Sequence, residues 1–280
     1  MVLAKLHTTA NDEKKVYYKG LVDSSGNRCG CGREYDEETG ELCYVGEFEN
    51  DVRNGKGIEI KVINDKTKVY LLTKWENGCQ IDESESKEAK KLMDHAKEMG
   101  LSNSNVKFVR ICKPVERDED WTLSPEIEFE GLVDVNTYRR IVGSVYIHKK
   151  VRSERVNEKS SPSSSLTVDI RKVYEGCFDE EGKYHDNNGK LYIKRTYTFE
   201  GEFDHGVMRK GLIRLNGIPL YEGEVNDRCE MNGRGKLYFS IPNNKRDGLV
   251  TAAEGEFSNN KLHGYGVAYY PPTSLTSNNG

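Results

Sequence analysis

The sequence predicts a mainly β protein: an elongated antiparallel β-sheet, or solenoid, of stacked hairpins, with one inserted or capping helix at about residues 82–99. Three observations support this fold class. A short phrase recurs along the chain: an aromatic residue, any residue, a glycine, an acid and usually a second aromatic. In the clearest copies, a Gly-x-Gly pair follows about ten residues later. The composition, with 27 glycines and 16 tyrosines but only 35% hydrophobic residues, suits a thin repeating sheet better than a large globular core.

One copy, Tyr44-Val-Gly46-Glu-Phe48, shows the physical logic of the repeat. Side chains alternate between the two faces of a strand, so both aromatics and the glycine share one face. The glycine leaves a gap into which a neighbouring ring can pack, although it weakens the strand. Polar turn formers at 50–54 close a hairpin, and Gly55-Lys-Gly57 opens the return strand. Because one hairpin is barely stable in water, hairpins of about 20 to 27 residues are expected to stack and bury a continuous aromatic strip.

Four copies share both the spacing and the residue types, and they begin at Tyr18, Tyr44, Tyr221 and Glu254. The pattern resembles the MORN repeat (membrane occupation and recognition nexus), whose motif runs Tyr-x-Gly-Glu-Trp/Phe, a short loop and Gly-x-Gly. The resemblance covers residues about 16–80 and 170–272. Degenerate copies are Phe129-Glu-Gly131, Tyr174-Glu-Gly176-Cys-Phe178, Phe199-Glu-Gly201-Glu-Phe203 and the segment from Leu71 to Gly78.

The distribution of repeat copies and of residue types along the chain predicts five segments. A first MORN-like block is expected at 16–80, and a second at 168–272. Between them, 81–151 is expected to hold the helix and degenerate β-repeats, and 152–167 a Ser-rich linker or loop. Residues 273–280 are expected to form a disordered tail.

The predicted helix has recognisable ends. Asp82 followed by Glu85 fits a capping box, and Gly100 stands where a C-terminal cap belongs. Ala89, Leu92, Met93, Ala96 and Met99 fall on one face at helical spacing. Three roles fit this pattern: a helix packed on the sheet, a cover for the edge of the first block, or a partner-binding helix.

Composition and charge exclude several protein classes. A net charge of −4 argues against general nucleic-acid binding, and no apolar run is long enough to span a membrane. Residues 1–15 show no signal-peptide pattern. The seven scattered cysteines fit reduced thiols, which indicates a cytoplasmic protein.

No catalytic motif stands out, so the chain is not expected to be an enzyme, and no catalytic residue, cofactor or metal site is predicted. Cys29-Gly-Cys31 with nearby Cys43 is the one metal-like cluster, but it lacks the second ligand pair of a structural zinc site, and the six histidines are dispersed. Acid pairs such as Glu222 and Glu224 recur with the repeat, which indicates a solvated face and not a catalytic dyad.

The resemblance implies a non-enzymatic scaffold or adaptor, sometimes dimeric, found with the cytoskeleton or with membranes. If the sheet curves, its aromatic strip lines a groove for a helix or an extended segment of a partner protein. The residues predicted to bind the partner are Tyr18, Tyr44, Phe48, Tyr174, Phe199, Phe203, Tyr221 and Phe257.

Two other functions remain open. A basic segment with a net charge of about +5 could tether the chain to anionic phospholipids, although a solvated linker explains the same charges. Its predicted lipid-binding residues are Arg139, Arg140, Lys149, Lys150, Arg152 and Arg155. The chain could also serve as the regulatory arm of an enzyme complex, because enzymes that contain this repeat carry catalysis in a separate domain.

Overall fold

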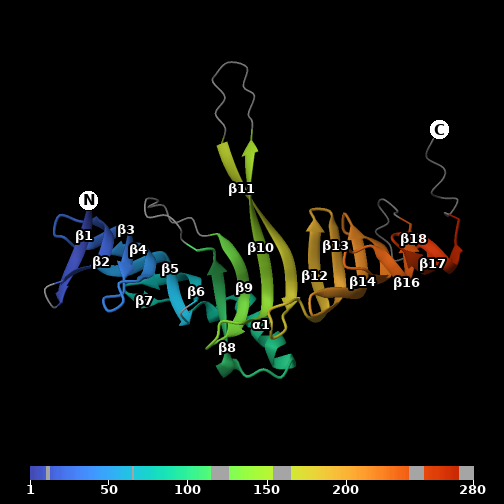
Figure 1. Cartoon of the computed structure of the whole chain (residues 1–280), viewed down its shortest axis with the longest axis horizontal. Helices are drawn as coiled ribbons and strands as arrows, with labels where there is room; N and C mark the ends of the chain where they lie inside the picture. Colours follow the sequence, from blue (N-terminus) through green and yellow to red (C-terminus); the bar gives the residue numbers. More distant parts are fainter. Residues whose placement is uncertain (11–12, 65, 115–125, 154–164, 240–248, 271–280) are drawn as a thin grey trace, which may run out of the picture. The chain divides into compact units, whose positions relative to one another are not determined.

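The computed structural model describes residues 1–10, 13–64, 66–114, 126–153, 165–239 and 249–270. In these residues, hydrogen bonds join the strands into an 18-stranded antiparallel sheet, and there is one α-helix, so the predicted mainly β class is confirmed (Figure 1). The chain divides into two compact units. Unit 1 comprises 1–139 and 146–171, and unit 2 comprises 140–145 and 172–280.

Unit 1 begins as a run of antiparallel strands in which each strand pairs with the next. Its strands are β1 (Val2–Ala10), β2 (Glu13–Val22), β3 (Arg28–Tyr35), β4 (Leu42–Glu49), β5 (Val52–Asn64), β6 (Thr67–Glu76), β7 (Cys79–Gln80), β8 (Val106–Cys112) and β9 (Ile127–Asp134). The 3-10 turns η1 (Glu83–Glu85) and η2 (Asn103–Asn105) flank the helix α1 (Lys87–Glu98). β8 pairs with β6 as well as β9, so the helical segment is an insertion between paired strands.

Unit 2 continues the same pattern, with each strand from β12 onward paired to its successor. Its strands are β12 (Asp186–Lys194), β13 (Tyr197–Asp204), β14 (Val207–Leu215), β15 (Ile218–Val225), β16 (Met231–Tyr238), β17 (Thr251–Ser258) and β18 (Lys261–Ala268). β10 (Arg140–Ser153) and β11 (Ser165–Cys177) contribute residues to both units.

Glycines of neighbouring repeats face one another across the strands, as equivalent rungs of a ladder. In unit 1 the row runs through Gly20, Gly32, Gly46 and Gly57. In unit 2 it runs through Gly189, Gly201, Gly211, Gly223, Gly235, Gly255 and Gly266. Stacked hairpins in register, predicted from the repeat, are therefore present in each unit.

The rings that fill the glycine gaps differ from the prediction in one respect. The ring over Gly46 and Gly57 belongs to Tyr44, the aromatic of the same strand, and not to a neighbouring hairpin. A Cβ added at Gly46 would lie 2.6 Å from Cζ of Tyr44 and 2.6 Å from Cα of Gly57. The glycine pairs beside the motif tyrosines, such as Gly46 and Gly57 at Tyr44, thus let the ring lie flat on the backbone, which buries the ring without a second layer of sheet. At Gly211 the neighbouring ring is that of Phe199, and at Gly266 the neighbouring side chain is that of Leu262.

Several hairpins close through two-residue turns in which both residues have positive φ. Asn50–Asp51 and Asn259–Asn260 are examples, with φ of 50°, 69°, 48° and 68°. This geometry matches the right-handed twist of the flanking strands and favours asparagine and glycine. One turn of this kind, between β13 and β14, begins with His205 at φ 47°.

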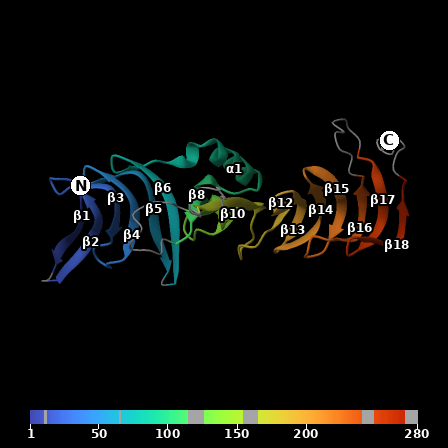
Figure 2. The same ribbon diagram turned by 90° about the horizontal axis from the view of Figure 1, so that it is seen from above.

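The helix starts later than predicted. Ser86 caps α1 by accepting a hydrogen bond from the backbone N–H of Ala89 at 3.2 Å, whereas Asp82 caps η1 through Ser84. The predicted C-terminal signal is correct: Gly100 has φ 79°, and Leu101 N–H donates to the Ala96 carbonyl at 3.0 Å. The helix packs against β9, and Ala89 and Ala96 are fully buried. Figure 2 shows α1 on one side of the sheet, near β8.

Strands also lie outside the two predicted repeat blocks. Strand β1 was not expected, because its sequence lacks the repeat motif, yet it pairs with β2 and packs Leu6 against the Tyr18 cluster. The predicted linker at 152–167 is strand at both ends, since β10 reaches Ser153 and β11 begins at Ser165. Its centre and the predicted tail at 273–280 lie outside the described residues.

Candidate functional site

The aromatic row of unit 1 is built from edge-to-face contacts. Tyr18 and Tyr44 flank Phe48, with ring centroids 5.2 and 5.4 Å apart and interplanar angles of 82° and 89°. Trp75 extends the row, 5.9 Å from Tyr44. This T-shaped geometry suits the charge distribution of aromatic rings, and it forms a continuous apolar floor across β2, β4 and β6.

Two arginines cover this floor. Arg28 Cζ lies 5.7 Å from the Tyr18 ring centroid and 5.1 Å from that of Phe48. Arg53 Cζ lies 4.3 Å from the Tyr44 ring centroid and 4.8 Å from that of Trp75. Each guanidinium therefore spans two rings, in the cation–π position that a planar arginine occupies well.

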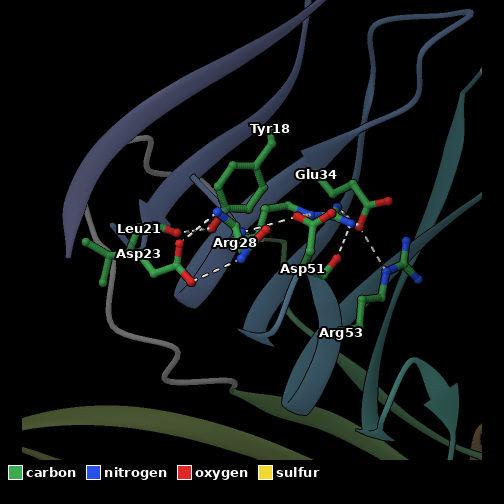
Figure 3. A network of polar contacts seen from close by, with 8 residues as sticks. Tyr18, Leu21, Asp23, Arg28, Glu34, Asp51 and Arg53 are labelled. Carbon is green, nitrogen blue, oxygen red and sulfur yellow. Dashed lines mark hydrogen bonds and ion pairs between the residues drawn. The ribbon is translucent and has the colours of Figure 1, made fainter. Parts of the chain in front are cut away.

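Carboxylates hold both arginines in place, as Figure 3 shows. Arg28 Nε donates to Asp51 Oδ1 at 2.9 Å, and its Nη2 donates to the Asp51 carbonyl. Glu34 Oε2 accepts from Arg53 Nε at 3.0 Å and lies 3.6 Å from Arg28 Nη1, so this carboxylate joins the two arginines. The Tyr18 hydroxyl donates to the Leu21 carbonyl at 2.9 Å beneath the network.

A groove of about 610 Å³ opens beside this network. It is lined by Tyr17, Arg28, Glu34, Tyr35, Asp36, Glu37, Glu38, Cys43 and Arg53. Four carboxylates against two guanidinium groups give the lining a formal net charge of −2. Burial, followed by the nearby Glu34 carboxylate, raises the pKa of the Cys43 thiol to about 11, so Cys43 is a poor nucleophile at neutral pH.

The eight predicted partner-binding aromatics are all buried, between 0% and 4% exposed. In unit 2, Phe203 packs edge-to-face against Tyr174 at 5.3 Å and Phe199 at 5.4 Å, and Tyr221 does so against Phe257 at 5.2 Å. A direct contact between these rings and a partner stays a prediction, because a buried ring reaches a partner only if its neighbours move. Their observed role is packing.

Sequence reasoning missed the residues that cover the rings. Arg28 and Arg53 both stand two residues before the glycine pair of their repeat, at Gly30 and Gly55, and this shared position was the available signal. Tyr184 was also missed, although it stacks on Tyr174 with centroids 3.8 Å apart. It lies between two motif copies and belongs to neither.

Five of the six predicted lipid-binding residues lie just before β10 or on it. Arg139 and Lys149 are exposed, and Arg140 is half-buried. Lys150 and Arg152 also lie on β10, while Arg155 lies outside the described residues. Strand β10 carries the basic segment as far as Ser153, while the linker or loop was predicted only from residue 152 onward.

Comparison with known families agrees with the geometry. The sequence profile of the MORN repeat family matches residues 44–65 and 254–273, which span the β4–β5 and β17–β18 hairpins. This chain carries MORN repeats. The MORN repeat is a non-enzymatic type of repeat that is generally involved in protein or membrane interactions. No curated protein matches the chain significantly. Among the described residues of this MORN-repeat chain, no helix has both the length and the apolar character to cross a bilayer.

Proposed function

We propose that this chain is a non-enzymatic scaffold that binds a helix or an extended segment of a partner protein in the groove of unit 1. The observation that supports this most directly is the Arg28–Glu34–Arg53 network, which covers the predicted aromatic row and presents ordered charge beside an open groove. Its ordered arginines lose little rotamer entropy on binding.

The lining indicates the chemistry of the partner. Arg28 and Arg53 are already paired with carboxylates, whereas Asp36, Glu37 and Glu38 are exposed at the rim. An acidic rim beside half-buried tyrosines favours a partner segment that carries lysine or arginine beside apolar side chains. Tyr17 and Tyr35, both half-buried, offer amphipathic contact area to such a segment.

Charge reversal at the rim tests this proposal without disturbing the core. Glu37→Lys with Glu38→Lys changes exposed residues only, and it should abolish recovery of partners that co-purify with the wild-type chain. The matched control is Asp94→Lys with Glu98→Lys, the same change of charge on the exposed face of α1. Equal recovery by the rim variant and the wild type would rule out the groove. Tyr→Ala changes are unsuitable here, because they remove buried packing residues.

A second function, peripheral binding to anionic phospholipids, is favoured by the exposure of Arg139 and Lys149. Vesicles containing phosphatidylserine should then sediment the chain at low salt and release it at high salt, since surface attraction is screened. Arg139→Glu with Lys149→Glu should prevent sedimentation. Binding that persists in this variant would exclude the basic segment as the membrane contact.

We also propose a second copy of the chain as a partner, through β18. Every residue of β18 is exposed, with Tyr265 at 89% and Val267 at 54%. Such a strand suits pairing with an equivalent strand. Light scattering should show a dimer that Tyr265→Lys dissociates, and a monomeric wild type would reject this pairing. None of the seven cysteines, all of which lie among the described residues, forms a disulfide, and this supports our proposal of a cytoplasmic site of action, at the cytoskeleton or a membrane.

A further inference from the structure

Side chains from separate segments meet at one corner of unit 2. His185 lies in the segment that leads into β12, Asp204 ends β13, and His205 opens the turn between β13 and β14. One ligand atom from each of these three residues lies within 4.8 Å of the others. The register that pairs β12 with β13 brings the two histidines together, with ring centroids 4.9 Å apart.

A fourth residue, Asp179, fixes the orientation of His205. Its side chain is 7% exposed, and Oδ1 accepts from the backbone N–H groups of Glu181 and Lys183 at 2.9 and 2.8 Å. The other oxygen lies 2.7 Å from His205 Nδ1. A carboxylate only accepts, so Nδ1–H donates and the lone pair of the imidazole is on Nε2. Nε2 lies 3.8 Å from Asp204 Oδ1.

His185 lies beside the same carboxylate oxygen, with its Nδ1 3.7 Å from Asp204 Oδ1. The backbone N–H of His205 donates to this Nδ1 at 3.4 Å, so the lone pair of the imidazole is on Nδ1, and an ion bound there would replace this long hydrogen bond. Arg209 donates to the other oxygen, Asp204 Oδ2, at 3.0 Å. This hydrogen bond fixes the position of the Asp204 carboxylate between the two histidines.

The backbone at His205 matches that of the other two-residue turns. His205 has φ 47° at the first position of its turn. The same position is asparagine in the turns at Asn50, Asn77, Asn216 and Asn259. Asparagine and histidine both tolerate this left-handed conformation better than most residues, so histidine fits the turn. A histidine that is also held by a buried carboxylate is consistent with a ligand-binding role at this turn.

We propose that His185, Asp204 and His205 bind a zinc ion, with Asp179 as the positioning residue behind His205. Two imidazoles and one carboxylate suit zinc, whereas magnesium and calcium prefer ligand sets made of oxygen. A tetrahedral ion with bonds of about 2.0–2.1 Å needs ligand atoms about 3.3 Å apart. Both histidines are exposed, so their side chains can rotate to close the difference from the observed 3.7 and 3.8 Å and from the 4.8 Å within which all three ligand atoms lie.

Zinc bound here would tie the loop at 179–185 to the tip of the β13–β14 hairpin. The fourth coordination position would remain open to water or to a partner side chain. Arg209 opposes the cation electrostatically. The histidines are dispersed along the sequence, so no metal site is predicted from their spacing. The pairing of β12 with β13 brings His185 and His205 together.

Isothermal titration of the full chain, without a histidine tag and after treatment with a chelator, tests the proposal with zinc chloride. We expect one zinc ion per chain. His205→Asn and His185→Asn should each weaken binding at least tenfold, and Asp179→Asn about tenfold to a hundredfold, as for other residues behind a metal ligand. His263→Asn, at an exposed histidine of β18, is the matched control and should bind as the wild type does.

His205→Asn separates binding from folding, because asparagine is the residue found in the other turns. Its thermal midpoint without zinc should stay close to that of the wild type, because asparagine suits the turn although the hydrogen bond to Asp179 is lost. Zinc should raise the midpoint of the wild type and of His263→Asn only. Three results would overturn the proposal: no saturable binding of one ion, unchanged affinity in both His205→Asn and His185→Asn, or equally tight binding of magnesium.

Discussion

The tyrosines of the aromatic row differ in one atom-level detail that stability measurements can detect. The Tyr18 hydroxyl donates to the Leu21 carbonyl three residues on, at 2.9 Å, and Tyr174 and Tyr221 make the equivalent bond at 3.0 Å. The Tyr44 hydroxyl is buried and has no hydrogen-bond partner among the described residues. Replacing tyrosine by phenylalanine therefore has opposite consequences at Tyr18 and Tyr44.

The magnitudes follow from hydrogen-bond energetics. Tyr18→Phe removes a bond with a net value of about 0.5–1.5 kcal/mol, and should lower the free energy of unfolding by roughly 1 kcal/mol. Tyr44→Phe removes a buried hydroxyl that has lost its hydration and gained no hydrogen bond. The substitution should therefore be neutral or stabilising by up to about 1 kcal/mol. The Arg53 guanidinium stays over the ring in either case.

Urea unfolding followed by tryptophan fluorescence is a suitable assay, because Trp75 contacts Tyr44 and reports on unit 1. We expect the midpoint of Tyr18→Phe to fall and that of Tyr44→Phe to hold or rise, with unchanged slopes. Tyr174→Phe and Tyr221→Phe, followed by circular dichroism, should behave as Tyr18→Phe does. A loss at Tyr44 as large as that at Tyr18 would refute the reasoning.

Three further predictions concern packing, capping and acid. Gly57→Ala places a methyl group against the Tyr44 ring, and should cost about 1–3 kcal/mol in chemical unfolding. A cost near zero would mean that the ring does not lie over the glycine pair. Ser86→Ala removes the cap of α1 and should cost about 1 kcal/mol, with a loss of helical signal in circular dichroism that Asp82→Ala does not reproduce. Hydrogen bonds, first from the Thr39 backbone N–H and then from its hydroxyl, hold the pKa of Asp36 below 3.8. Its contribution to stability is therefore complete above the unfolded value, and is lost as the pH falls through the lower folded value. Asp36→Asn should flatten the pH dependence of the unfolding midpoint below about pH 4, and an unchanged profile would assign the acid sensitivity to other groups.

The strand pattern was readable from the sequence because it depends on local chemistry. Alternation around Gly46 assigns Tyr44 and Phe48 to one face, and a preference for Asn at the turns follows from φ alone. The groove was not readable in the same way. Its arginines, Arg28 and Arg53, are placed by register and by charge partners on other strands, such as Glu34. The start of α1 was missed because Ser86 and Asp82 both satisfy a capping rule, and only the path of the chain through η1 separates them.

The repeat itself restricts where recognition can occur. In a single-layer sheet, the motif tyrosine must lie flat over its glycine pair. This packing leaves no part of the ring accessible to solvent, since Tyr18, Tyr44, Tyr174 and Tyr221 are all 0% exposed. Residues that every repeat needs for stability cannot also distinguish one partner from another, because they present nothing to solvent.

Specificity for a partner must then come from positions that the motif leaves variable. Arg28 and Arg53 occupy such positions above the rings, and His205 occupies one at a hairpin tip where other repeats carry asparagine. The functional residues of this chain are therefore to be sought where a repeat departs from its own pattern.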